Sequence, residues 1–201
     1  MSELDHWEAR FASADYVFGT EPNAFLAKQK PLLPKAGRAL AVADGEGRNG
    51  VWLAEQGLDV LSIDFSPAAQ AKARALAQAR NVRLTTELVD VTKWRWPAAE
   101  YDVVAVIFTQ FVAPDDRHEM FARIRDTIKP GGLLLLEGYT PRQLRYGTGG
   151  PKQIENLYTR ELLEREFASF SQLSIDEYDC ELNEGTRHTG MSAVIDLVAR
   201  K

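Results

Sequence analysis

The chain contains a single cysteine, Cys180, among its 201 residues. A lone thiol excludes an intrachain disulfide and a thiolate metal cluster, and the strand-like stretch around it predicts a buried, unreactive side chain. Long apolar runs are also absent, since none approaches the ~18 residues of a membrane-spanning helix. The first residues have neither a basic start nor an apolar core, so we expect no secretory signal and a cytoplasmic protein.

Basic residues are fewer than acidic ones: the chain has 24 Lys and Arg and 29 Asp and Glu, which gives a formal net charge of −5. Nucleic acids and anionic membranes select basic surfaces, so we expect neither as a partner. Hydrophobic residues make up 45% of the chain and charged residues 26%, which is the balance of an ordinary soluble globular protein. We expect a monomer or homodimer without a bound metal.

From residue 38 onward, strand-like and helix-like segments alternate. We expect strands at 39–43, 59–64, 82–89, 102–108 and 133–137, helices at 49–56, 68–80, 114–128 and 159–167, and a closing hairpin of strands 173–181 and 191–199. Residues 1–37 are aromatic and read as irregular, apart from a short helix at 24–29. This alternation predicts an α/β fold with a doubly wound, mostly parallel sheet, and the hairpin makes one of the last two strands antiparallel.

The most informative pattern is a glycine-rich turn between the first strand and the first long helix. Gly45, Gly47 and Gly50 form a GxGxxG, and Asp64 ends the next strand 19 positions after Gly45. Glycines let the backbone approach a ligand, and the following helix offers unpaired N–H groups. A carboxylate at the end of the next strand accepts hydrogen bonds from a ribose diol. The pattern therefore predicts an adenosine-containing cofactor.

Together with later motifs, this turn resembles that of the class I S-adenosylmethionine (SAM) dependent methyltransferases. The matching segments are Ala43-Asp-Gly-Glu-Gly-Arg-Asn49, Asp64-Phe-Ser-Pro67, Leu88-Val-Asp90, Tyr101-Asp102 and Lys129-Pro-Gly-Gly132. The resemblance implies a Rossmann-like sheet of seven strands in the order 3-2-1-4-5-7-6, with strand 7 antiparallel. It also implies SAM as cofactor and S-adenosylhomocysteine (SAH) as product.

No linker-like composition divides the chain, so we expect a single domain over residues 1–201. Within it, 1–37 would form a leader or lid, 38–138 the cofactor-binding core, and 139–201 the substrate side and the closing hairpin. The leader, with Trp7-Glu-Ala-Arg-Phe11 and Tyr16 to Asn23, resembles that of the small tellurite-resistance and thiopurine-type methyltransferases. In those enzymes the leader folds over the cofactor.

One position departs from the family pattern. The acid that usually stands two positions before the first glycine is missing, since the nearby residues are Ala41 and Ala43. Asp44 follows immediately. We hypothesise that Asp44 or Glu46 takes over and reaches the ammonium group of the methionine half.

The resemblance assigns roles to individual residues. Ala43 and Gly45 would lie against the methionine half, Asp64 would bind the ribose, and Asp90 the adenine amino group. The full set of expected cofactor residues is Ala43, Asp44, Gly45, Asn49, Asp64, Phe65, Ser66, Asp90, Val91 and Phe108, with Arg10 and Tyr16 from the leader.

The methyl acceptor is expected at the carboxyl ends of the fourth and fifth strands. Phe111, Tyr139, Tyr146 and His188 are the residues that we expect near a small-molecule acceptor. No catalytic residue is assigned, because methyl transfer needs alignment and exclusion of water, and a base only when the nucleophile carries a proton of high pKa. His188 is a candidate base, whereas His118 is expected on a helix surface.

Two other functions share parts of this pattern. An NAD(P)-linked oxidoreductase would use the same glycine turn and Asp64, but it gives no reason for the closing hairpin. A non-catalytic SAM-binding protein would keep Asp64 and Asp90 and have an occluded acceptor pocket.

Overall fold

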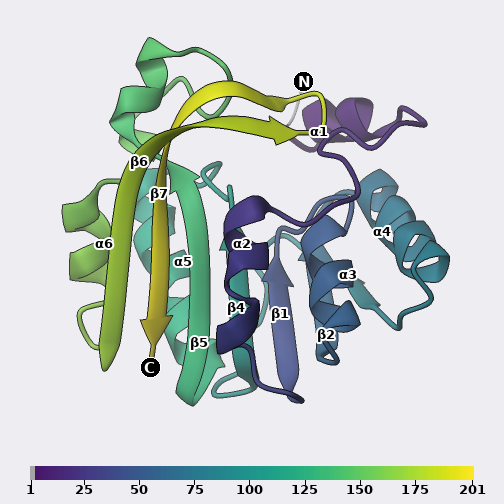
Figure 1. The fold of residues 1–201 in the computed structure, drawn as a ribbon, viewed down its shortest axis with the longest axis horizontal. Helices are drawn as coiled ribbons and strands as arrows, with labels where there is room; N and C mark the ends of the chain where they lie inside the picture. The colour runs from purple at the N-terminus through teal and green to yellow at the C-terminus, as the bar shows by residue number, and fades with distance from the viewer. Residues whose placement is uncertain (1–2) are drawn as a thin grey trace.

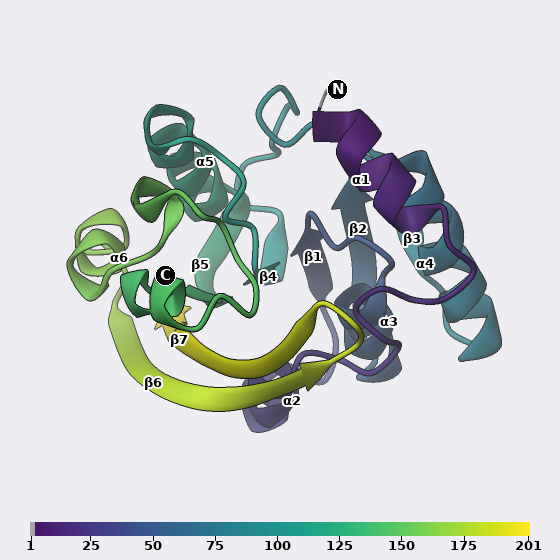
Figure 2. The ribbon, with the colours of Figure 1, turned by 90° about the horizontal axis from the view of Figure 1, so that it is seen from above.

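The computed structural model describes residues 3–201, and its centre is a seven-stranded sheet with helices on both faces (Figures 1 and 2). The strands are β1 (Arg38–Val42), β2 (Asp59–Asp64), β3 (Thr85–Leu88), β4 (Tyr101–Ile107), β5 (Ile128–Tyr139), β6 (Gln172–Glu184) and β7 (His188–Arg200). Their order is β3-β2-β1-β4-β5-β7-β6, and β7 runs antiparallel to both of its neighbours. The predicted fold class and strand order are therefore confirmed.

Six α-helices and three short 3₁₀ helices complete the described part. They are α1 (Glu3–Phe11), α2 (Ala24–Lys28), η1 (Lys30–Leu32), α3 (Arg48–Glu55), α4 (Pro67–Ala79), α5 (Pro114–Thr127), η2 (Pro141–Arg145), η3 (Ile154–Asn156) and α6 (Arg160–Glu166). None of these helices combines the length and the apolar composition that a membrane-spanning segment requires.

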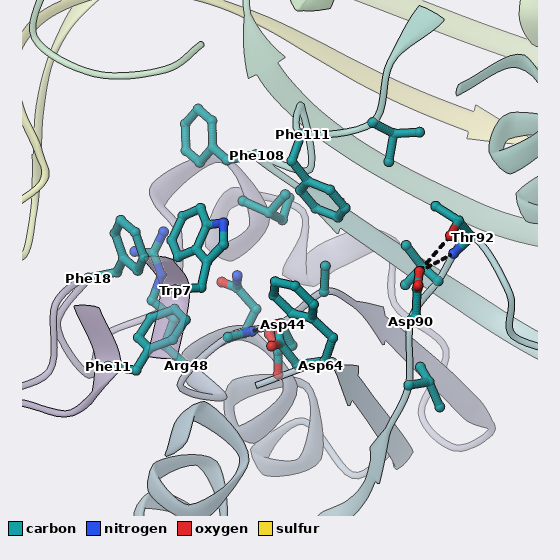
Figure 3. Close-up of a pocket in the computed structure, with 18 of the residues that line it drawn as sticks. Trp7, Phe11, Phe18, Asp44, Arg48, Asp64, Asp90, Thr92, Phe108 and Phe111 are labelled. Atoms are coloured by element: carbon teal, nitrogen blue, oxygen red, sulfur yellow. Dashed lines mark hydrogen bonds between the residues drawn. The ribbon is translucent and has the colours of Figure 1, made fainter. Parts of the chain in front are cut away.

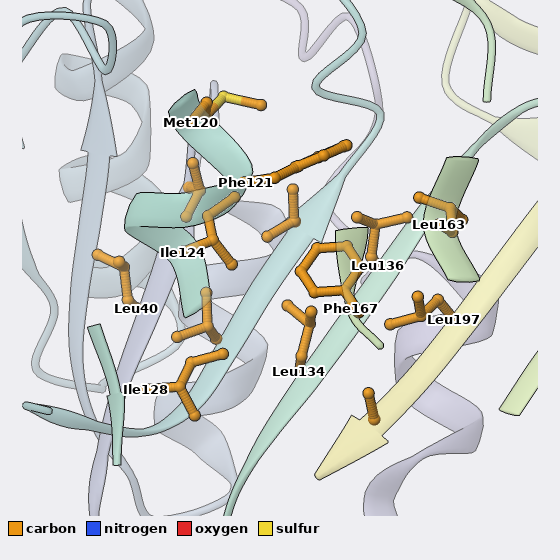
Figure 4. Close-up of a cluster of buried hydrophobic side chains, with 14 of the residues drawn as sticks. Leu40, Met120, Phe121, Ile124, Ile128, Leu134, Leu136, Leu163, Phe167 and Leu197 are labelled. Carbon is orange, nitrogen blue, oxygen red and sulfur yellow. The ribbon is translucent and has the colours of Figure 1, made fainter. Parts of the chain in front are cut away.

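The sheet separates two cores because its central strands are apolar on both faces. Leu40 and Val42 of β1 face α5, while Ala39 of the same strand faces α2 and α3. Figure 4 shows the larger core, where Phe121 and Ile124 of α5 pack on the sheet. This two-sided burial matches a strand pattern without polar alternation.

Three helices begin at side chains that accept a hydrogen bond from a backbone N–H of their first turn. Asn23 accepts from Leu26 at 2.9 Å, Ser66 from Ala69 at 3.1 Å, and Thr159 accepts in the same way at the start of α6. Such caps satisfy donors that the helix itself leaves unpaired. The helix expected at 68–80 is present as α4, with Ser66 as its cap and Pro67 as its first residue.

Several predicted boundaries were wrong. Residues 82–84 do not belong to β3, because Asn81 adopts a φ of 54° and the N–H of Val82 bonds back to Ala77 to close α4. The hairpin strands extend further than expected at both ends, to 172–184 and 188–200. The leader was expected to be irregular before residue 24, yet it contains α1, whose Phe11 docks beside Ala69 of α4. This tertiary contact compensates for a helix only nine residues long.

The tip of the hairpin lies against the leader, as Figure 2 shows from above. The N–H of Thr186 donates to the carbonyl of Val17 at 2.8 Å. Gly185 has a φ of +68°, and a Cβ built there would lie 2.3 Å from the oxygen of Val17. Only glycine fits this contact, which brings the leader and the hairpin together above the carboxyl ends of the parallel strands.

Replacing Gly185 by alanine should therefore loosen the leader. We expect Gly185→Ala to lower the free energy of unfolding by about 1 to 3 kcal/mol more than Gly131→Ala does. Gly131 is a matched control, since it has a φ of +76° with no atom within 4 Å of an added Cβ. Denaturant unfolding measures the difference, and equal losses in the two variants would show that the contact contributes nothing.

Candidate functional site

A cavity of about 430 Å³ opens at the carboxyl ends of β1, β2 and β4 (Figure 3). Its wall is built by the segments that directly follow these strands, where the connections on the two sides of β1 diverge. Open α/β sheets bind ligands at this point because two loops leave the edge in opposite directions. Of the residues predicted at a cofactor, the lining includes Ala43, Asp44, Gly45, Asn49, Asp64, Phe65, Asp90, Val91 and Phe108.

Asp64, the last residue of β2, is fixed by the backbone. Its two carboxylate oxygens accept from the N–H groups of Gly45 and Ser66, each at 2.9 Å. Burial raises the pKa of Asp64, and these hydrogen bonds oppose that rise. Because each oxygen keeps a further lone pair, the carboxylate is positioned to accept the two hydroxyls of a ribose.

Asp44, in the glycine turn itself, takes the space that a side chain at position 50 would need. It accepts from Ser62 Oγ at 2.8 Å and from the N–H of Gly50 at 3.1 Å, and a Cβ on Gly50 would lie 2.4 Å from its Oδ2. The third glycine of the motif thus makes room for Asp44. Burial raises the pKa of Asp44 to about 7.

The far wall of the cavity carries Asp90 and Val91. Asp90 accepts from the N–H of Thr92 at 3.0 Å and pairs with Lys93 at 2.8 Å. Burial tends to raise the pKa of Asp90, but the hydrogen bonds from Lys93 and Thr92 prevail and lower it. Apolar Val91 and Phe65 line the same cavity as this carboxylate, a combination that suits a flat ring with an amino group.

Aromatic side chains of the leader form the roof. In Figure 3, Trp7, Phe11 and Phe18 lie on one side of the cavity and Phe108 and Phe111 on another. The Trp7 and Phe11 rings stack with centroids 5.4 Å apart. Sequence reasoning did not place the three leader aromatics in the site, although the aromatic richness of residues 1–37 was the available signal.

A second, larger cavity of about 1200 Å³ adjoins the first. It lies between the leader, the loop after β5 and the tip of the hairpin. The two cavities share a wall, made by Trp7, Phe18, Phe108, Phe111, Ala113 and His188. The two cavities therefore meet along these side chains.

His188, the first residue of β7, stands at this junction. Its ring centroid lies 4.5 Å from that of Phe18 and 4.4 Å from that of Phe108. Its Nδ1 is buried and lies 3.9 Å from the Glu184 carboxylate, too far for a hydrogen bond. Burial is the main cause that lowers the pKa of His188, so the imidazole is neutral at neutral pH.

Two residues of this site adopt a left-handed backbone that is uncommon outside glycine. Ala43, just after β1, has a φ of 48°, and Phe108, just after β4, has a φ of 54°. Each conformation costs of the order of 1 kcal/mol, which the surrounding structure must offset. Strain at both strand ends fits a region held in shape for a ligand.

A buried polar network fastens the leader to this region. Asn23 donates to Glu137 and, at 3.1 Å, to Glu184, while Arg48 pairs with Glu184 at 2.6 Å. Burial tends to raise the pKa of Glu184, but His188 and Arg48 lower it to about 2. Burial, followed by the charges of Asp196 and Glu184, raises the pKa of Glu137 well above its usual range.

Of the residues expected at the cofactor or the acceptor, three line neither cavity, and Arg10 lines the other one. Tyr16 donates to the carbonyl of Lys72 on α4, and Ser66 is the buried cap of α4, so neither lines a cavity. Tyr146 points to Asp179, at 2.9 Å, outside the second cavity. Arg10 lines the second cavity instead of the first.

Three residues expected near the acceptor do line the second cavity. Tyr139 lines the second cavity, and Phe111 and His188 line both. The structure does not support Glu46 as a substitute acid, because it accepts from the N–H of Val17 at 2.8 Å and pairs with Lys72. Cys180 is half-buried, and burial raises the pKa of its thiol.

Part of the chain matches known methyltransferases in sequence. Residues 39–132 match the family model of a methyltransferase domain. A glycine/sarcosine N-methyltransferase of Halorhodospira halochloris is 34% identical over 144 residues, which cover 67% of this chain and 48% of that enzyme. A carboxy-S-adenosyl-L-methionine synthase of Pseudomonas savastanoi is 38% identical over 86 residues, 40% of this chain and 35% of that protein. The chain thus spans less than half of either relative.

Solved structures share the fold at low sequence identity. A SAM-dependent methyltransferase of Methanosarcina mazei has a TM-score of 0.69 at 17% identity, covering 90% of this chain and 98% of that one. TehB of Haemophilus influenzae has a TM-score of 0.73 at 15% identity, covering 98% and 66%. A phosphoethanolamine N-methyltransferase of Haemonchus contortus, solved with phosphomonomethylethanolamine and SAH, has a TM-score of 0.72 at 17% identity, covering 96% and 57%.

The raised pKa of Asp44 predicts a pH-dependent stability. Between the ordinary value of 3.8 and about 7, the unfolded chain loses the proton that the folded state keeps. The free energy of unfolding therefore falls as the pH rises through this window, by about 1.4 kcal/mol for each pH unit. Asp44→Asn keeps an acceptor for Gly50 and should flatten this slope.

Denaturant unfolding of the ligand-free protein at several pH values measures the effect. As the pH rises from about 4 to 7, the free energy of unfolding of Asp44→Asn should increase relative to that of the original chain. A constant difference between the two proteins across this window would contradict the account.

Proposed function

We propose that this chain, in which residues 39–132 form a SAM-dependent methyltransferase domain, transfers a methyl group to a small molecule bound in the second cavity. One observation carries the proposal: the cavity whose lining suits a nucleoside adjoins a larger cavity along a shared wall of aromatic rings and His188. A cofactor and an acceptor would meet at that wall.

The first cavity fits the cofactor by the chemistry of its donors and acceptors. Asp64 would accept the ribose hydroxyls, and Asp90 the adenine amino group, with Phe65 and Val91 on the ring faces. Asp44 lies on the side of the glycine turn and would face the ammonium of the methionine half. A cation at that place favours the ionised carboxylate, so binding would release the proton that burial holds on Asp44.

When bound, SAM supplies an electrophilic methyl group whose departure leaves a neutral thioether, so no acid has to assist. The chain's own contribution is to align the acceptor and exclude water. Trp7, Phe18 and Phe108 provide an apolar enclosure at the junction. Glu184, near Nδ1 of His188, favours the tautomer with the proton on that atom, which leaves Nε2 free to accept one.

A nitrogen acceptor suits this arrangement. An amine is protonated at neutral pH and must lose that proton before it attacks, which gives a neutral histidine a role. The glycine/sarcosine N-methyltransferase that matches most of this chain supports the same class. The leader resemblance, together with the fold shared with TehB, supports a place near the small tellurite-resistance enzymes and a soft acceptor as the second candidate.

The proposal also covers the domain organisation, the location and the oligomeric state of the protein, and it weighs the alternative functions. We propose a single domain over residues 1–201, acting in the cytoplasm as a monomer or homodimer without nucleic acid, in keeping with the net charge of −5. The antiparallel β7 and the matching family argue against the NAD(P)-linked alternative. A non-catalytic SAM-binding protein would have an occluded acceptor pocket, whereas here a cavity of about 1200 Å³ adjoins the first.

Asp64 provides the first test. Because hydrogen bonds to a charged group contribute about 1.5 to 3 kcal/mol each, Asp64→Asn should weaken SAH binding by about a hundredfold or more. Calorimetric titration measures it, with thermal unfolding to verify that the turn persists. Asp59→Asn, at the opposite end of the same strand, should bind SAH normally. Binding of NAD in place of SAH would overturn the cofactor assignment.

His188 provides the second test. His188→Asn should lower kcat by about a hundredfold for an amine acceptor and remove the acidic limb of the pH profile. That limb lies below pH 6.5, since the pKa of His188 is lowered from this value and the base must be unprotonated. SAH affinity should change little.

His118→Asn is the matched control, because His118 is exposed on α5 and pairs with Glu166 at 2.9 Å. It should keep the kcat and pH profile of the original chain. A His188→Asn variant with an unchanged acidic limb would show that this histidine moves no proton.

A further inference from the structure

The second cavity gathers positive charge in a chain whose net charge is −5. Three cationic side chains line it, Arg10 from α1, Lys152 from the loop before η3, and Arg187 from the hairpin tip, against a single carboxylate residue, Glu155. These cations come from three distant segments of the sequence. Within residues 3–201, no ion pair of the structure involves any of the three.

Arg10 and Arg187 are close enough to influence each other. The Arg10 guanidinium lies over the ring of Trp7, 4.6 Å from its centroid, which limits its orientation. Burial, and next the charge of Arg187, lower the pKa of Arg10. Two guanidinium groups that repel each other across a cavity are stabilised when an anion lies between them.

Other donors line the same cavity without a partner. The N–H groups of Thr148, Gly149 and Gly150 find no acceptor among the described residues. The hydroxyl of Tyr139 is buried and unpaired, and a Cβ on Gly149 would lie 3.1 Å from it. Tyr139 as a whole is only 2% exposed. Such a set of donors favours a ligand that accepts hydrogen bonds and carries negative charge.

We propose that the methyl acceptor carries an anionic group, a carboxylate or a phosphate, which Arg10 and Arg187 hold in the second cavity. This inference rests on the proposed methyl transfer and narrows its substrate class. Because Arg187 directly precedes His188 in the sequence, anchoring the anion beside the hairpin tip brings the rest of the acceptor to the junction with the first cavity.

The test uses two bare anions, inorganic phosphate and acetate, as probes. Titration of the ¹⁵N-labelled protein, with and without SAH, follows the amide signals of Thr148, Gly149 and Arg187. We expect saturable shifts with dissociation constants of about 1 to 10 mM for at least one probe. Tighter binding of phosphate would indicate a phosphorylated acceptor, and equal or tighter binding of acetate a carboxylate.

Variants locate the anion. Arg187→Gln should weaken probe binding by at least about tenfold, because it removes one of the two guanidinium groups. Arg145→Gln changes the net charge equally but removes an arginine of η2 that lines neither cavity, so it should leave probe binding unchanged. SAH affinity should stay within about twofold in both variants.

Several outcomes would overturn the proposal. They are the absence of saturable shifts, equal weakening by the two variants, and an undiminished affinity in Arg187→Gln. A tenfold loss of SAH affinity in Arg187→Gln would mean that the anion is the carboxylate of the cofactor itself. Failure of the proposed function appears separately, as a protein that binds no SAH, and the probe shifts are measured in that case too.

Discussion

The buried network of Asn23, Arg48, Glu137 and Glu184 is the interaction on which the site depends. It joins the leader, α3, β5 and β6, four segments that the sequence keeps far apart. Removing one partner would leave a charge or a polar group buried without compensation, which costs several kcal/mol. The network thereby holds the leader in the position where its aromatic rings roof the first cavity and bound the second.

Asp44 of the glycine turn and Asp64 at the end of β2 are suited to different ligand groups by their surroundings. Asp64 is held by two backbone N–H groups, which oppose the effect of burial and orient its oxygens into the cavity. Burial raises the pKa of Asp44 to about 7. A cationic group beside Asp44 would therefore stabilise its ionised form. The Asp64 carboxylate is instead oriented to accept hydrogen bonds from neutral hydroxyl groups.

Much of this could be predicted from the sequence, because local patterns determine it. The glycine turn and the apolar central strands predicted the alternating α/β fold and the place of Asp64, whereas the strand order came from the family resemblance. Tyr16, Ser66 and Tyr146 lie outside the linings of the two cavities, because tertiary contacts position leader and loop side chains: they bond to Lys72, Ala69 and Asp179. The resemblance implied that the leader covers the cofactor, but it did not assign this role to Trp7, Phe11 and Phe18, because α1 acquires its place only by docking on α4.

The most direct test of the central claim is a crystal structure of the protein with SAH. The account predicts that the ribose lies within hydrogen-bond reach of Asp64 and that the sulfur faces the junction between Phe108 and His188, open to the second cavity. A complex in which the adenosine lies outside the first cavity, or in which the sulfur is walled off from the second, would contradict methyl transfer across this junction.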